Sequence, residues 1–195
     1  MLRLLEDQGD VIRARMRRKK TLRLQVRPQT ALAFTIEEKA AMIAEARNRR
    51  SPHIVPALML ALHVGLRDAE IRGLQWERVD LVRAILTVGE SKTDAGAGRT
   101  IPLNADVLAT LVAHAKWYLD KFGETRPEWY VFPFGRPQPT DPTRPATTFK
   151  TVWAKVRSET GIKGRWHDAR HTFVTDLAED GAVSDGTIRQ LAGHV

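Results

Sequence analysis

Residues 51–74, SPHIVPALMLALHVGLRDAEIRGL, decide the fold because they hold the longest apolar run of the chain between two helix boundaries. Ser51-Pro52 favours the start of a helix, since proline is tolerated in the first helical turn. The helix predicted after it is apolar on all sides, through Ile54, Val55, Leu58, Met59, Leu60 and Leu62. Such a helix is typical of the buried centre of a domain. The sequence therefore predicts a central helix that Gly65 ends, followed by a short helix over 68–74.

Helical patterns also flank this central stretch. Thr35 and Glu38 form a Thr-x-x-Glu capping box, which predicts a helix through about Arg49. Asn104 predicts the start of an amphipathic helix that keeps its spacing to Gly123. Three more helices are expected towards the C-terminus, at about residues 146–160, 168–179 and 184–191.

Strand patterns are fewer and shorter. Residues 81–89 and 99–103 alternate between apolar and polar positions, which predicts two strands joined as a hairpin by the small residues of 91–98. Residues 126–145 contain six prolines and predict an extended loop. The predicted fold class is mainly α with a small antiparallel β-hairpin or sheet, an α+β domain.

The composition limits the classes of protein. A chain of 195 residues is long enough for one domain with a core and an appended arm. No apolar run reaches the roughly 18 residues that a membrane span requires, and Met1 is followed by a mixed, charged stretch rather than a signal peptide. The absence of cysteine excludes disulfides and thiol chemistry. A cytoplasmic location is the simplest interpretation.

Positive charge is concentrated at the N-terminal end. The formal net charge is +8, and residues 1–50 hold 13 Lys/Arg against 6 Asp/Glu. The densest run contains Arg13, Arg15, Arg17, Arg18, Lys19, Lys20, Arg23 and Arg27. Such a run neutralises the phosphates of a nucleic acid by releasing counterions. A solvated basic tail without fixed contacts explains it equally well.

Cationic and imidazole side chains recur in a fixed order along the rest of the chain, at Arg67, Lys92, His167, Arg170 and His194. His167 and Arg170 are three residues apart at the start of a helix and project from one face. Arginine binds two phosphate oxygens at once through its planar fork and stays charged. Each residue taken alone has an ordinary explanation: Arg67 pairs with Glu70, Lys92 is an exposed loop lysine, and His167 is a capping or core histidine.

The strings around these residues, taken together, resemble the tyrosine recombinase (phage integrase) family from about residue 35 onwards. The strings are GLRDAEI at 65–71, KT at 92–93 with RTIPL at 99–103, HDARHTF at 167–173, and LAGH at 191–194. Ala169 replaces the leucine usual in the His-x-x-Arg box, which is a change in packing.

The resemblance implies a domain organisation. Residues 31–195 are expected to form the family's catalytic domain, and residues 1–30 a basic linker left from an N-terminal DNA-clamping domain. The family's tyrosine nucleophile is expected about nine residues after His194, beyond Val195, so the catalytic domain is C-terminally truncated. The tyrosines present, Tyr118 and Tyr130, both precede the His-x-x-Arg box.

The resemblance also implies a mechanism for site-specific DNA recombination or integration. A tyrosine attacks the scissile phosphate and forms a 3′-phosphotyrosyl bond, with no metal or cofactor. Arg67 and Arg170 would bind the non-bridging oxygens, and Lys92 would protonate the departing 5′-oxygen. His167 would assist proton transfer from the tyrosine, and His194 would hydrogen-bond the phosphate. The expected partner is double-stranded DNA, with a tetramer on two duplexes for the full-length protein.

Other functions remain as alternatives. A type IB topoisomerase shares the chemistry, but usually has lysine where His167 stands. A DNA-binding fragment without catalysis is consistent with the lack of a tyrosine after His194. A zinc site at His167 and His171 is disfavoured, because the metalloprotease pattern His-Glu-x-x-His is absent and Arg170 places a cation between the two ligands.

Overall fold

The computed structural model describes residues 33–89, 97–135 and 138–193 of the chain. Its helices are α2 (Ile36–Arg47), α3 (Ile54–His63), α4 (Asp68–Arg72), the 3-10 helix η2 (Trp76–Arg78), α5 (Ala105–Phe122), α6 (Lys150–Thr160), α7 (Trp166–Asp180) and α8 (Asp185–Ala192). Its strands are β1 (Val79–Asp80), β2 (Ile85–Thr87), β3 (Thr100–Pro102), β4 (Pro133–Phe134) and β5 (Asp141–Pro145). The predicted fold class is confirmed: the described residues are mainly helical, with two small antiparallel sheets.

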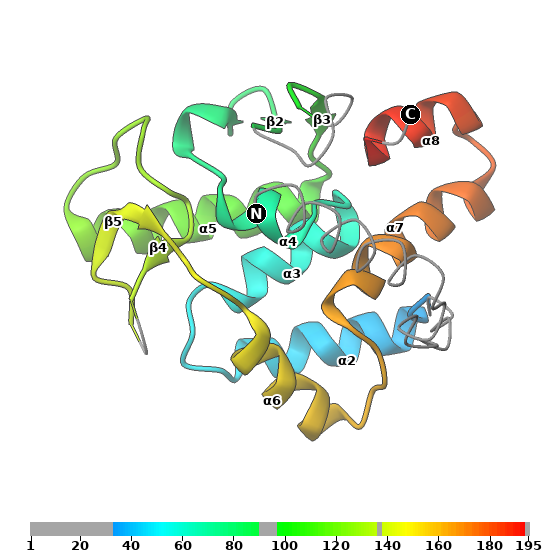
Figure 1. The fold of residues 1–195 in the computed structure, drawn as a ribbon, viewed down its shortest axis with the longest axis horizontal. Helices are drawn as coiled ribbons and strands as arrows, with labels where there is room; N and C mark the ends of the chain where they lie inside the picture. Colours follow the sequence, from blue (N-terminus) through cyan, green and yellow to red (C-terminus); the bar gives the residue numbers. More distant parts are fainter. Residues whose placement is uncertain (1–32, 90–96, 136–137, 194–195) are drawn as a thin grey trace, which may run out of the picture. The chain divides into compact units, whose positions relative to one another are not determined.

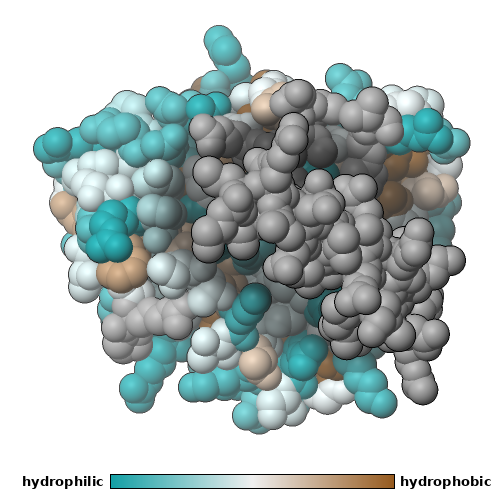
Figure 2. All heavy atoms as spheres, in the orientation of Figure 1, coloured by the Kyte–Doolittle hydropathy of each residue, from teal (hydrophilic) through white to brown (hydrophobic). Residues whose placement is uncertain are grey.

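Helix α3 lies at the centre of the domain, as its apolar sequence predicts. It packs against α2, α4, α5 and α7, and Figure 1 shows it among these helices. Eight of its ten residues are buried. On the face drawn in Figure 2, hydrophilic residues cover most of the coloured surface and hydrophobic residues appear in small separate patches. No helix of the described ranges is long and apolar enough to cross a membrane.

The capping signals of the sequence act as expected at the starts of two helices. The hydroxyl of Thr35 accepts from the backbone N–H of Glu38, and the Glu38 carboxylate accepts from the backbone N–H of Thr35 at 2.9 Å. The Asn104 side chain likewise accepts from the backbone N–H of Val107 at 2.9 Å. These bonds satisfy donors that a helix start leaves open.

The strands differ from the prediction in extent. Strand β2 pairs with β1 on one side and with β3 on the other, and both pairings are antiparallel. The predicted extended loop at 126–145 is partly wrong, because β4 and β5 pair within it. Proline removes a backbone donor, so it is tolerated at the edge of a sheet and not in its middle. The prolines of β5 therefore fit a two-stranded ribbon.

Gly65 lies in the turn after the central helix α3, where the backbone passes close to α7. Its φ is +68°, in the left-handed region that glycine adopts without strain. A Cβ atom at this position would lie 2.3 Å from Cδ1 of Phe173, a buried residue of α7. The close approach of the turn after α3 to α7 therefore depends on the missing side chain.

A cluster of aromatic and imidazole rings fills the space between α3, α5 and β4. The His53 ring lies 5.9 Å from that of His114 and 5.7 Å from that of Phe132, centroid to centroid. Nε2 of His53 bonds the Pro133 carbonyl, and Nε2 of His114 bonds the Val131 carbonyl. Burial lowers the pKa of His53 to about 3 and that of His114 to about 4. Both rings are therefore neutral at pH 7.

Replacing Gly65 with alanine is expected to destabilise the fold. Gly65→Ala should lower the free energy of unfolding by about 3 kcal/mol, through left-handed strain and overlap with Phe173. The matched control is Gly123→Ala, because Gly123 has φ +78° but nothing within 4 Å of its added Cβ. Only the strain remains there, and about 1 kcal/mol should be lost. Urea unfolding measures both, and equal losses would contradict the packing role.

The buried histidines predict a loss of stability in acid. The unfolded chain binds a proton at each histidine below about pH 6.5, whereas the folded chain resists protonation until about pH 3 to 4. Their contribution to stability is therefore complete above pH 6.5 and is lost as the pH falls towards 4. The His114→Gln variant should lose about 2 kcal/mol less than the parent between pH 7 and pH 5 in urea unfolding. Identical losses would show that His114 does not contribute.

Candidate active site

Arg67 stands at the start of α4, in the turn that follows Gly65. It is the N-cap of this helix, and its backbone N–H donates to Glu70 Oε2 at 2.8 Å. Its guanidinium also donates to Glu70, from Nη1 to Oε1 at 2.8 Å. The side chain of Arg67 is 18% exposed and that of Glu70 only 2%. The i,i+3 pairing considered from the sequence is present, but its carboxylate is buried.

Glu70 is the centre of a larger ionic cluster. Arg99, just before β3, donates to both carboxylate oxygens of Glu70 at 3.1 and 2.8 Å. Arg170 of α7 places Nη1 4.0 Å from Glu70 Oε2. Glu70 is therefore a buried carboxylate with partners from three segments of the chain. A buried charge requires partners, and three guanidinium groups surround this one.

The same three arginines bind the C-terminal end of α8. Arg99 Nε donates to the Leu191 carbonyl at 3.0 Å, and Arg67 Nη2 to the Gly193 carbonyl at 3.3 Å. Arg170 Nη2 donates to the carbonyl between them, that of Ala192. A helix leaves its last carbonyls without helical partners and carries partial negative charge there. The arginines therefore fix the end of α8 beside Glu70.

Arg170 and His167 both come from the first turns of α7. Arg170 is 3% exposed, and its Nη1 also donates to the Gly65 carbonyl. Burial lowers the pKa of Arg170 to about 10, with Arg67 adding to the effect and Glu70 opposing it. Arg170 therefore remains charged at neutral pH.

His167 is exposed beside this cluster. Its ring lies edge-on to that of His171, with 4.8 Å between centroids. Burial, followed by the neighbouring His171 and Arg170, lowers the pKa of His167. A neutral imidazole is therefore favoured at pH 7, and such a ring is able to accept a proton. No group of three His, Asp or Glu able to hold a metal ion occurs in the described ranges.

The structure brings Arg67 and Arg170 together, with His167 on the same helix as Arg170. Lys92, His194 and the basic run of residues 13–27 lie outside the described residues. Sequence reasoning missed the role of Arg99, which it placed in a strand pattern and in the string RTIPL of the family resemblance without assigning it a function. No local pattern marks this role, because the partners Glu70 and Leu191 lie 29 and 92 residues away in the chain.

Neither tyrosine of the chain lies in the arginine cluster. Tyr118 of α5 is fully buried, and its hydroxyl donates to the Tyr130 carbonyl at 3.1 Å. Burial raises the pKa of Tyr118 to about 12. Tyr130 pairs through its backbone with Gln75 in an isolated bridge. Both tyrosines therefore belong to the packing between α5 and the loop before β4.

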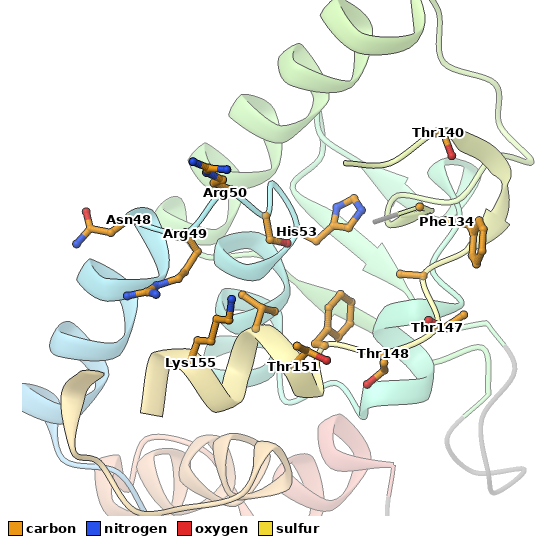
Figure 3. Close-up of a pocket in the computed structure, with 15 residues that line it drawn as sticks. Asn48, Arg49, Arg50, His53, Phe134, Thr140, Thr147, Thr148, Thr151 and Lys155 are labelled. Carbon is orange, nitrogen blue, oxygen red and sulfur yellow. The ribbon is translucent and has the colours of Figure 1, made fainter. Parts of the chain in front are cut away.

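A pocket of about 1130 Å³ lies apart from these arginines, between the end of α2, the β4–β5 ribbon and the start of α6. Figure 3 shows Arg49, Arg50 and Lys155 around it, together with a series of threonines and His53. It contains none of the site residues predicted from the sequence. One lining residue, Phe149, stacks on Trp166, the neighbour of His167, with ring centroids 5.5 Å apart.

Removing the charge of Glu70 should cost much of the stability of the domain. Glu70→Gln leaves three buried or half-buried guanidinium groups without their carboxylate, which is expected to lower the free energy of unfolding by about 3 kcal/mol. The matched control is Glu77→Gln, because the Glu77 side chain is 46% exposed and its ion pair with Arg78 is longer, at 3.7 Å. Its change should stay within about 0.5 kcal/mol. Urea unfolding of both variants measures the difference, and similar losses would contradict the central role of Glu70.

Comparison with known proteins places the chain in a family. Residues 33–195 match the Phage integrase family. Tyrosine recombinase XerA of Pyrococcus furiosus is 28% identical over 170 residues, which are 86% of this chain and 55% of that protein. The integrase of Salmonella phage P22 is 26% identical over 139 residues, which are 68% of this chain and 34% of that protein. The chain thus spans about half, or less, of the length of these relatives.

Solved structures share the fold. A crystal structure of XerA recombinase superposes with a TM-score of 0.68 at 20% identity, over 84% of this chain and 55% of that one. The Tn1549 transposon integrase, in complex with transposon right end DNA, gives a TM-score of 0.68 at 17% identity, over 88% and 60%. The catalytic domain of bacteriophage HP1 integrase gives 0.57 at 19% identity, over 84% and 81%. The chain therefore belongs to the phage integrase family of tyrosine recombinases, and its described residues carry the fold of the family's catalytic domain.

Proposed function

We propose that the protein performs site-specific recombination of double-stranded DNA by cleaving and rejoining strands through a 3′-phosphotyrosyl intermediate. The observation that carries the proposal is the convergence of Arg67 and Arg170 on one buried carboxylate, Glu70. Charge builds on the non-bridging oxygens as a phosphodiester is attacked, and fixed cations stabilise that charge. Held guanidinium groups need little reorganisation to do this.

In this proposal the remaining site residues move protons. His167, whose lowered pKa favours the neutral ring, accepts the proton of the attacking tyrosine hydroxyl. Lys92 donates a proton to the 5′-oxygen as its bond to phosphorus breaks, and His194 hydrogen-bonds the phosphate. The P–O bond to the tyrosine forms as the P–O bond to the 5′-oxygen breaks. The bond energy is therefore kept in the protein–DNA link, and no oxidant or nucleotide is needed.

The partner we propose is duplex DNA, with a tetramer on two duplexes as the working assembly of the full-length protein. Two kinds of observation support DNA as the partner. The chain has a net charge of +8, concentrated in its first 50 residues. The Tn1549 integrase and the recombinase XerH, which share this fold, have both been solved with DNA. In our proposal the basic residues 13–27 add phosphate contacts, which position a protein without reading sequence.

We propose that the attacking tyrosine comes from outside residues 1–195. Tyr118 is fully buried, donates its hydrogen bond to a backbone carbonyl, and has a pKa raised to about 12, so it is a poor nucleophile. Tyr130 lies in the same packed region rather than beside Arg67. These residues support a second candidate function for the 195 residues by themselves, which is DNA binding without covalent chemistry.

A nicked suicide substrate tests both functions. Cleavage releases a short strand with a 5′-hydroxyl, which diffuses away and leaves the protein attached to DNA. Residues 1–195 should form no adduct, whereas the same chain with about 20 further residues from its parent gene should form one. Arg170→Lys in the longer chain should reduce the adduct at least roughly tenfold, because lysine keeps the charge and loses the two-pronged fork. Denaturing gel electrophoresis measures the adduct.

The controls separate the nucleophile from the fold. Tyr118→Phe in the longer chain should leave the adduct yield unchanged if it folds normally. An adduct formed by residues 1–195, and abolished by Tyr118→Phe or Tyr130→Phe, would overturn the assignment of the nucleophile. Normal cleavage by Arg170→Lys would place the phosphate clamp elsewhere.

A further inference from the structure

Arg99 is the member of the ionic cluster that pairs with both carboxylate oxygens of Glu70 through its two terminal nitrogens, and it is as deeply buried as Arg170. Its side chain is 4% exposed, compared with 18% for Arg67. All three of its nitrogens are engaged within the protein: Nη1 and Nη2 bond the two oxygens of Glu70, and Nε bonds the Leu191 carbonyl. The two-pronged pairing commits this guanidinium to a carboxylate, whereas Arg170 lies 4.0 Å from Glu70.

The contacts of Arg99 join three segments that are distant in sequence. Arg99 directly precedes β3, Glu70 belongs to α4, and Leu191 is in the last turn of α8. Figure 1 shows β3 and α8 beside each other. The backbone of Arg99 is fixed as well, because its carbonyl accepts from the Val88 N–H at 2.9 Å. The side chain therefore holds α4 and α8 against one end of the β2–β3 pair.

The charge of Arg99 also changes what Glu70 can do to its other partners. Three guanidinium groups and one carboxylate give the cluster a formal charge of 3 − 1 = +2. Arg99 occupies both oxygens of Glu70, so the carboxylate is largely neutralised before Arg67 and Arg170 are counted. Without Arg99, the formal charge would fall to +1, and Glu70 would attract the two remaining guanidinium groups more strongly.

We infer that Arg99 is a positioning residue for phosphate binding. It offsets the charge of Glu70 and anchors the end of α8, so that Arg67 and Arg170 keep their orientation and the carboxylate weakens their attraction for the scissile phosphate less. The inference rests on the proposed function, because it deepens the role of the same cluster. Arg99 acts through Arg67 and Arg170 and does not itself touch the DNA.

The inference predicts a defect in the rate of cleavage and not in DNA binding. In the full-length protein, Arg99→Gln should lower the single-turnover rate on the nicked substrate roughly tenfold to a hundredfold at saturating protein. Affinity for intact DNA should change by less than about threefold, because the buried side chain contributes no direct phosphate contact. Arg99→Lys, which keeps the charge but cannot bond both oxygens and the carbonyl together, should lie between.

A matched control separates positioning from general stability. Lys39→Gln also removes an ion pair between distant elements, at 2.8 Å from Asp176 of α7, with the lysine 14% exposed. All rates are measured well below the lowest unfolding midpoint of the set. The Lys39→Gln variant should cleave at the parent rate, and a slowing equal to that of Arg99→Gln would overturn the inference.

A double-mutant cycle tests the route of the effect. Arg99→Gln should slow an Arg67→Gln protein at least roughly threefold less than it slows the parent, because part of its effect passes through Arg67. Equal slowing in both backgrounds would overturn the inference and leave the proposed function intact. A parent protein that forms no adduct, despite binding DNA, would overturn the proposed function and the inference with it.

Discussion

A single buried carboxylate organises the cationic side of this domain. Glu70 is 2% exposed at its side chain and is held by guanidinium groups from the N-cap of α4, from the residue before β3 and from α7. Guanidinium groups brought this close repel each other, and their repulsion grows as water is excluded. The carboxylate attracts each of the three groups, which offsets their mutual repulsion and allows the three elements to meet. Every other contact of the cluster, including those to α8, depends on this balance of charge.

The hydrophobic core and the ionic cluster meet at one turn. Gly65 ends the central apolar helix α3, its backbone lies against the ring of Phe173, and its carbonyl accepts from Arg170. Arg67 follows two residues later as the N-cap of α4. Burial of α3 thereby fixes the position of Arg67 relative to Arg170 on α7. Packing in a protein interior is dense and stiff, so this arrangement positions the arginines more firmly than a surface loop would.

The sequence predicted the elements that follow from local rules. The all-round apolarity of α3 and the caps at Thr35 and Asn104 depend on neighbours a few residues away, and the structure has them as predicted. The β4–β5 ribbon was missed because prolines mask a strand pattern. The convergence of Arg67 with Arg170 was expected from the family resemblance, not from spacing. The place of Arg99 could not be predicted, since its partners Glu70 and Leu191 lie 29 and 92 residues away.

The attachment of α8 has a consequence for the order in which the domain is assembled. The carbonyls at its end are bound by Arg67, Arg99 and Arg170, which lie 126, 92 and 22 residues earlier in the chain. During synthesis, α3 can bury its apolar surface against α2 and α5 long before residues 191–193 leave the ribosome. The arginine cluster closes only when that last segment arrives, because contacts between distant residues form late. A nascent chain can therefore bury part of the surface of α3 before its arginine cluster is complete.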